Sequence, residues 1–156
     1  MRRDHFELEA HNVDWVDTDD PPAEPRVIID FDGPKETLTE RLTGADGDLL
    51  DASETDVTFR LQDSLDDPDA TGVVGVTDRI TGDFLLELNE DASDVLRFVR
   101  AAREYGKSTG DTGQYAVTLR IDGEPLTTYS KSTFLVYDAN GSLLRSKSLI
   151  PSGVEL

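Results

Sequence analysis

Two carboxylates stand at the end of an apolar stretch in "RVIIDFDG", residues 26–33, where they could take part in chemistry. The run of Val and Ile before Asp30 and Asp32 predicts a buried strand. A strand terminus presents its side chains rigidly at an open edge, where a carboxylate can act on a ligand. An enzyme site is therefore one hypothesis for this stretch.

The Asp-x-Asp-Gly pattern in "IIDFDGP" resembles the opening motif of the haloacid-dehalogenase-like phosphatases. The resemblance implies that Asp30 is the nucleophile, that Asp32 is the general acid/base and that a carboxylate holds Mg²⁺. The sequence departs from that family at Pro34, where a Thr is usual, and its later strands alternate in polarity instead of reading as buried parallel strands. A Mg²⁺-dependent phosphatase is therefore kept as an alternative. The main expectation is a protein without catalysis, metal or cofactor.

A cluster of cations on a predicted helix is the second feature that could bind a ligand. The stretch "DVLRFVRAAREYGK", residues 94–107, has an apolar face that we expect to pack on a sheet: Val95, Phe98, Val99, Ala102 and Tyr105. Its cations gather on the opposite flank: Arg97, Arg100, Arg103 and Lys107. Attraction to the helix dipole accounts for the two cations near the C-terminus but fades beyond the last turn.

The chain around this helix is strongly acidic, with a formal net charge of −18. Residues 97–147 nevertheless hold eight cations and five acids, whereas residues 1–96 hold 7 cations and 27 acids. Three explanations remain open: an internal salt-bridge network, an acidic protein surface (another copy included), and the phosphates of nucleic acid or another ligand. Known nucleic-acid motifs are absent from the sequence. We predict that this flank contacts an acidic protein partner, with nucleic-acid or phosphate binding as the alternative.

The acidic residues are mostly Asp, 22 against 11 Glu, and the basic residues are 11 Arg and only 4 Lys. Such a charge destabilises a compact chain in dilute buffer, whereas the Debye length of roughly 3 Å at 1 M salt screens the repulsion. This balance resembles cytoplasmic proteins of salt-loving archaea. The opening "MRRDHFELEAHNVDWVD" is similar to those of an uncharacterised haloarchaeal family of short acidic proteins, which implies no known activity. We expect a halophilic cytoplasmic protein.

Several other patterns favour plain structural interpretations. Without cysteine, the chain has no disulfides or thiolate metal sites. It has no apolar run long enough to span a bilayer. It also lacks the apolar stretch of a signal peptide. "YGKSTG", residues 105–110, lacks the earlier glycine of a phosphate-binding loop and is interpreted as a helix end followed by a loop. We interpret the acidic clusters at 46–51 and 63–69 as hydrated surface, and expect no metal at His5 and His11.

The strand and helix patterns predict one α+β domain over residues 1–156. The expected order is two strands, a helix, three strands, a second helix and three strands, the last two forming a hairpin around Asn140-Gly141. Residues 17–25 form an acidic, proline-rich connector after the first strand. We expect a mostly antiparallel sheet of about eight strands with two helices on one side. Residues 56–63 and 116–123 match at an offset of 60, so an internal duplication is a further hypothesis.

Overall fold

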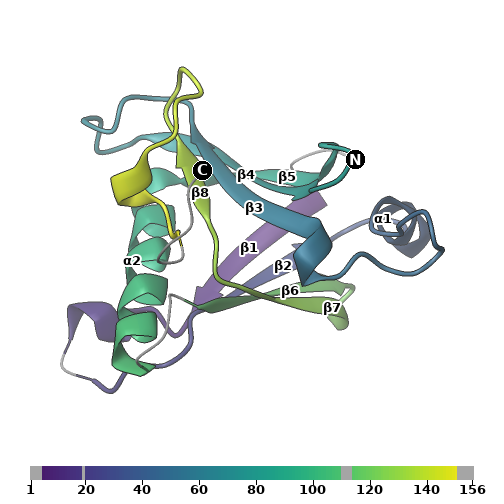
Figure 1. Ribbon diagram of the computed structural model, residues 1–156, viewed down its shortest axis with the longest axis horizontal. Coiled ribbons are helices and arrows are strands. Elements are labelled where there is room, and N and C mark those ends of the chain that lie inside the picture. The colour runs from purple at the N-terminus through teal and green to yellow at the C-terminus, as the bar shows by residue number, and fades with distance from the viewer. Residues whose placement is uncertain (1–4, 19, 110–113, 151–156) are drawn as a thin grey trace.

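The computed structural model describes residues 5–18, 20–109 and 114–150. Within these ranges eight strands form two four-stranded sheets that face each other, and a helix lies at each end of the pair (Figure 1). The α+β class is that predicted from the sequence, and the order of helices and strands is as predicted up to β6 (Tyr115–Ile121).

The first sheet has the order β1-β2-β6-β7. Its strands are β1 (Phe6–His11), β2 (Arg26–Phe31), β6 (Tyr115–Ile121) and β7 (Glu124–Lys131). β2 lies antiparallel to β1 and parallel to β6, and β6 lies antiparallel to β7. The β2–β6 pair joins segments far apart in the sequence.

The second sheet has the order β5-β4-β3-β8. Its strands are β3 (Thr55–Leu61), β4 (Thr71–Asp78), β5 (Phe84–Asp91) and β8 (Leu135–Tyr137). The pairs β3–β4 and β4–β5 are antiparallel, and β3–β8 is parallel. Each sheet therefore contains one parallel pair.

The core lies between the sheets because each strand turns its apolar residues toward the facing sheet. Val57, Phe59 and Leu61 of β3 are buried as their alternation predicted. Side chains from both sheets and both helices form a single buried cluster. The two sheets therefore share one core.

The expectation of one sheet of about eight strands was wrong in its layering. Eight strands spaced about 4.8 Å apart would leave a broad apolar face to be covered. The only longer helices described are α1 (Lys35–Arg41), of seven residues, and α2 (Ala92–Thr109), of 18 residues. They are too small to cover such a face, so the strands divide into two sheets that bury each other.

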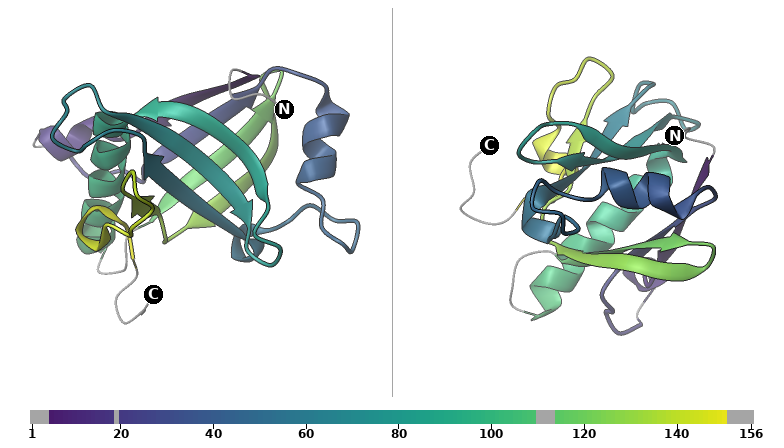
Figure 2. Two further views of the ribbon diagram at one scale, coloured as in Figure 1. Left: turned by 90° about the horizontal axis from the view of Figure 1, so that it is seen from above. Right: turned by 90° about the vertical axis from the view of Figure 1, so that its right-hand side faces the viewer.

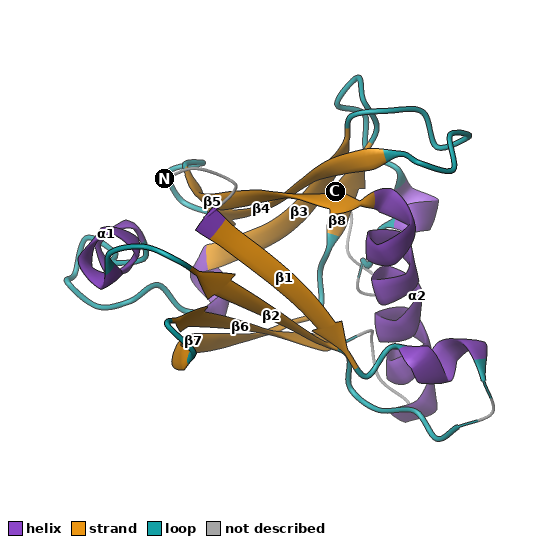
Figure 3. Ribbon diagram, turned by 180° about the vertical axis from the view of Figure 1, so that it is seen from behind, coloured by secondary structure: helices purple, strands orange, loops and turns teal. Residues whose placement is uncertain are grey.

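The prediction that both helices lie on one side of the sheet was wrong. They lie at opposite ends of the paired sheets (Figure 3). α1 follows Pro34, which precedes its first turn, and buries Leu38. The prediction that α2 ends at Gly106 was wrong, because the helix continues to Thr109. Residues 110–113, part of the predicted loop, lie outside the described residues.

The C-terminal region differs from the predicted hairpin. The turn at Asn140-Gly141 is present, with a bridge between Tyr137 and Leu143, but the returning segment forms the short 3-10 helix η4 (Arg145–Lys147) instead of a strand. The third strand of this region is β7, which the sequence reading missed. Its Pro125 and its polar residues conceal the alternation that pairing with β6 imposes.

The proposed duplication stays a hypothesis. β3 and β6 correspond at the offset of 60, but their neighbours differ. β3 lies between β4 and β8, whereas β6 lies between β2 and β7.

Candidate functional site

Helix α2 separates its apolar residues from its cations as the sequence predicted. Val95, Phe98, Val99 and Ala102 are buried, and Tyr105 is half-buried. Asp94 in the first turn and Lys107 in the last turn both suit the helix dipole. The flank that carries Arg97, Arg100 and Arg103 faces two short 3-10 helices, which lie beside α2 in Figure 1.

Arg97 and Arg100 form ion pairs with the first short 3-10 helix, η2 (Asp14–Asp17). Arg97 donates from Nη2 to Oδ1 of Asp14 at 2.8 Å and from Nε to Oδ2 of Asp17 at 2.9 Å. Arg100 donates from Nη2 to the other oxygen of Asp17. The hydrogen bond to Asp17, more than any other contact, raises the pKa of Arg97, which stays charged. The segment that follows β1 therefore folds back onto α2.

Arg103 contacts the second short helix, η4, through backbone carbonyls. Its Nη2 donates to the carbonyl oxygen of Ser148 at 2.8 Å and to that of Ser146 at 3.3 Å. A cation at carbonyls that end a helix is favourable because their partial charges are negative. The guanidinium of Arg103 is thus held by the C-terminal segment.

Lys107, the fourth predicted contact residue, lies apart from the other three. Its Nζ is 3.2 Å from Oε1 of Glu104, one turn earlier on α2. It does not line the space between α2 and η4. The structure therefore brings together three of the four predicted residues.

A groove of about 390 Å³ runs between α2 and η4. The cations that line it are Arg97, Arg100, Arg103 and Lys147. Ser93 and Ser146 add hydroxyl groups, and Leu96 and Val99 add apolar surface. Lys147 was not among the predicted contact residues, although it belongs to the basic segment 97–147. We call this feature the basic groove.

The internal contacts hold the arginines in place without using all their donors. A guanidinium carries more N–H groups than these bonds engage, and Arg100 donates through Nη2 alone in the contacts described. Lys147 is exposed and has no ion pair among the described residues. The groove therefore offers several fixed donors and one free ammonium to an anion.

The remaining cations of the basic segment do not belong to this surface. Arg120 lies on the first sheet and pairs with Asp30, and Lys131 is buried. Nζ of Lys131 donates to the carbonyl oxygens of Ala52 and Thr55, and burial lowers its pKa. The cations that are close in sequence are thus divided among the basic groove, the Lys107–Glu104 pair, the Arg120–Asp30 pair and the buried Lys131.

Asp30, the alternative catalytic residue, takes part in a two-bond ion pair. Nε and Nη2 of Arg120 donate to its two oxygens at 2.8 and 2.7 Å. The pair spans the parallel strands β2 and β6, and the hydrogen bond raises the pKa of Arg120. Asp32 is exposed just beyond β2. This geometry gives Asp30 a structural role, and the phosphatase hypothesis stays a prediction.

The described residues contain no group of three or more His, Cys, Asp or Glu side chains placed to hold a metal ion. His11 lies 3.4 Å from the Glu9 carboxylate on the same strand. Among the residues that the structure describes, no helix is long and apolar enough to cross a membrane.

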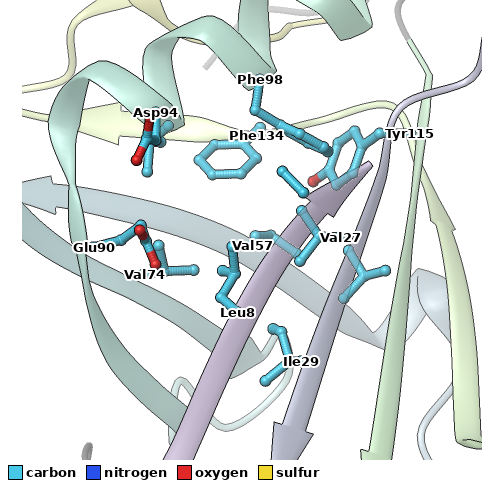
Figure 4. Close-up of a pocket in the computed structure, with 13 residues that line it drawn as sticks. Leu8, Val27, Ile29, Val57, Val74, Glu90, Asp94, Phe98, Tyr115 and Phe134 are labelled. Atoms are coloured by element: carbon cyan, nitrogen blue, oxygen red, sulfur yellow. The ribbon is translucent and has the colours of Figure 1, made fainter. Parts of the chain in front are cut away.

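A second space, partly open to solvent, lies between the sheets and under α2 (Figure 4). Its volume is about 40 Å³ and its lining is apolar apart from Glu90 and Asp94. Burial raises the pKa of Glu90, and the Asp94 and Asp91 charges add to this effect. The volume falls far below the roughly 300 Å³ of a small-molecule site, so this cavity is a packing defect.

The fold and the groove together define a small two-sheet α+β protein with a cationic groove on its longer helix. The chain belongs to a family of unknown function, DUF5793, whose match covers residues 1–156. No curated protein and no solved structure matches this chain.

Proposed function

We propose that this protein is a non-catalytic binding protein whose basic groove takes an acidic segment of a protein partner in a salt-rich cytoplasm. The observation that supports the proposal is the groove itself. Three arginines and Lys147 line about 390 Å³ of space in a chain whose net charge is −18.

Arginine suits this task because its planar guanidinium can donate two parallel hydrogen bonds to one carboxylate. Asp17 and the carbonyl of Ser148 already hold Arg100 and Arg103 in position, so less side-chain freedom is lost when a ligand binds. The internal network and a binding site are therefore compatible explanations of the same cations.

An acidic peptide fits the charge balance better than a nucleic acid does. A duplex carries one negative charge per roughly 1.7 Å, and the acidic remainder of this chain would repel it. Molar salt also removes most of the counterion release that drives nucleic-acid binding. The groove is a local feature of one helix and η4, which matches a short acidic segment.

Lys147 is a sharper test residue than Arg97 or Arg100. Changing either arginine to Glu would place a carboxylate against Asp14 or Asp17 and would loosen η2. Lys147 is exposed, so Lys147→Glu should leave the fold intact. Lys107→Glu makes the same charge change outside the groove and is the matched control.

The experiment is an NMR titration in molar KCl with a short polyglutamate peptide. We expect shifts at α2 and η4, and binding at least about tenfold weaker in Lys147→Glu with Lys107→Glu unchanged. Parallel titrations with pyrophosphate and a single-stranded oligonucleotide test the alternative ligands. Equal loss in both variants, or no shift with the peptide, would refute the proposal.

A further inference from the structure

The outer face of the second sheet carries a broad hollow that neither α1 nor α2 covers. Residues from β3, β4, β5 and β8 and from the following turn line it, and its volume is about 760 Å³. The left view of Figure 2 looks onto this sheet from outside, with the helices at its two ends. Gly75 forms part of the floor, where a Cβ would lie 3.2 Å from the Phe84 ring. The missing side chain lets the Phe84 ring lie close against β4.

Phe84 lines this hollow, and the turn that precedes β5 carries a second exposed apolar side chain. Phe84 at the start of β5 is 54% exposed, and Ile80 in the preceding turn is 78% exposed. Exposed apolar side chains beside a hollow are typical of an interaction surface, since their burial removes apolar area from water.

The charges around the hollow cancel, in contrast to the rest of the chain. Its charged lining residues are Arg60 of β3 and Glu87 of β5. These strands lie on either side of β4, and Glu87 is paired in register with Gly75. The face thus has a cation on one side of β4 and an anion on the other.

We propose that this face binds a second copy of the chain, with a two-fold axis that lies between the facing sheets of the two copies and runs parallel to β4, over Gly75. A two-fold interface uses the same patch on both partners, so the patch must be complementary to itself. Such an axis brings Arg60 of each copy to Glu87 of the other. It also places the exposed Phe84 of each copy against the facing hollow of the other. This inference is independent of the basic groove.

The net charge favours this face over the rest of the surface for contact between two copies. Two chains of charge −18 repel each other, and their approach costs least where the surface is neutral and the opposing charges are complementary. The four strands hold 7, 8, 8 and 3 residues, and at about 4.8 Å spacing and about 3.3 Å per residue they bury roughly 800 Å² over two copies. This area falls below the roughly 1,000 Å² of a stable specific interface, so the dimer is weak and forms at high protein concentration.

Sedimentation velocity of the full chain in molar KCl, over a wide range of protein concentration, measures the association. We expect the unmodified chain to dimerise and the single variants Arg60→Glu and Glu87→Arg to shift toward monomer. Phe84→Ser should weaken the dimer without any change of charge, and Lys107→Glu should leave it unchanged. Thermal melts check that each variant is folded.

Mixing the two charge variants separates contacts between chains from contacts within one chain. An equal mixture of Arg60→Glu and Glu87→Arg should dimerise again, because both intermolecular pairs then join opposite charges. Charge pairs within each chain stay mismatched in that mixture. A chain that is monomeric at every concentration, single variants that dimerise like the unmodified chain, or a mixture that stays monomeric would overturn the proposal.

Discussion

Tyr115 and Tyr129 are both about 1% exposed, and only one of their hydroxyl groups has a hydrogen-bond partner in the described structure. Tyr115 donates to the carbonyl oxygen of Thr133 at 2.6 Å. Burial raises the pKa of Tyr129 to about 12, and the Asp51 and Glu54 charges add to the rise.

We expect Tyr129→Phe to be neutral or up to about 1 kcal/mol more stable at pH 7, since it removes an unpaired buried hydroxyl. Tyr129 deprotonates more readily in the unfolded chain, so its contribution to stability is lost as the pH rises from 10 to about 12. The variant should therefore lose less stability than the unmodified chain in this window. Denaturant unfolding at several pH values in molar KCl measures both effects.

Tyr115→Phe is the control, because it deletes a hydroxyl that is hydrogen-bonded. It should cost about 1 kcal/mol at pH 7. Equal effects of the two substitutions at pH 7 would contradict the assignment of partners.

Glu90 is a second residue whose environment opposes its charge. Its raised pKa means that the folded chain binds the proton more tightly than the unfolded chain. Stability from this group is thus present below about pH 4.5 and is lost as the pH rises through the raised folded value. We expect Glu90→Gln to raise the free energy of unfolding at pH 7 by about 0.5 kcal/mol or less, since solvent screens a partly buried group. The gain should vanish at acidic pH, and a gain that persists there would rule out this cause.

At the scale of elements, the fit between the sheets and α2 is incomplete around the 40 Å³ cavity. The apolar side chains that line this space lack the contacts that a filled core would give them. Val74 of β4 lines the cavity, whereas the fully buried Val76 of the same strand does not.

We expect Val74→Ile to stabilise the fold by about 0.5–1 kcal/mol, because the added methylene fills empty space. Val76→Ile adds the same group where no cavity lies, and overpacking should cost about 1–3 kcal/mol. Urea unfolding of both variants measures the difference. Equal destabilisation by the two would show that the cavity cannot accept the added group.

At the scale of the whole molecule, 33 acids against 15 cations make salt the dominant solvent variable. Exposed ion pairs such as Arg79–Asp56 contribute little in water and less in brine, so they cannot offset the repulsion. We expect the melting temperature to rise markedly between 0.1 M and 2 M KCl as the repulsion is screened. Circular dichroism melts measure it, and an unchanged midpoint would refute a halophilic protein.

The sequence by itself determined the local elements. The alternation of Val57, Phe59 and Leu61 fixes which face of β3 is buried, and the spacing of Val95, Phe98 and Val99 fixes the buried face of α2. These patterns have short periods and act within one element, so they can be read without knowing the rest of the fold. The class α+β and the cationic flank follow from them.

Only the tertiary structure decided which elements meet. The division into two sheets, the parallel β2–β6 pair and the covering of α2 by η2 and η4 all join distant segments. Asp17 and Arg97 are 80 residues apart, and Asp30 and Arg120 are 90 apart. Pairings between distant segments depend on how all the helices and strands pack together to bury their apolar surface, which no short stretch of sequence specifies. For this reason a chain rich in carboxylates does not reveal which acid faces which cation, or that Lys147 completes the groove.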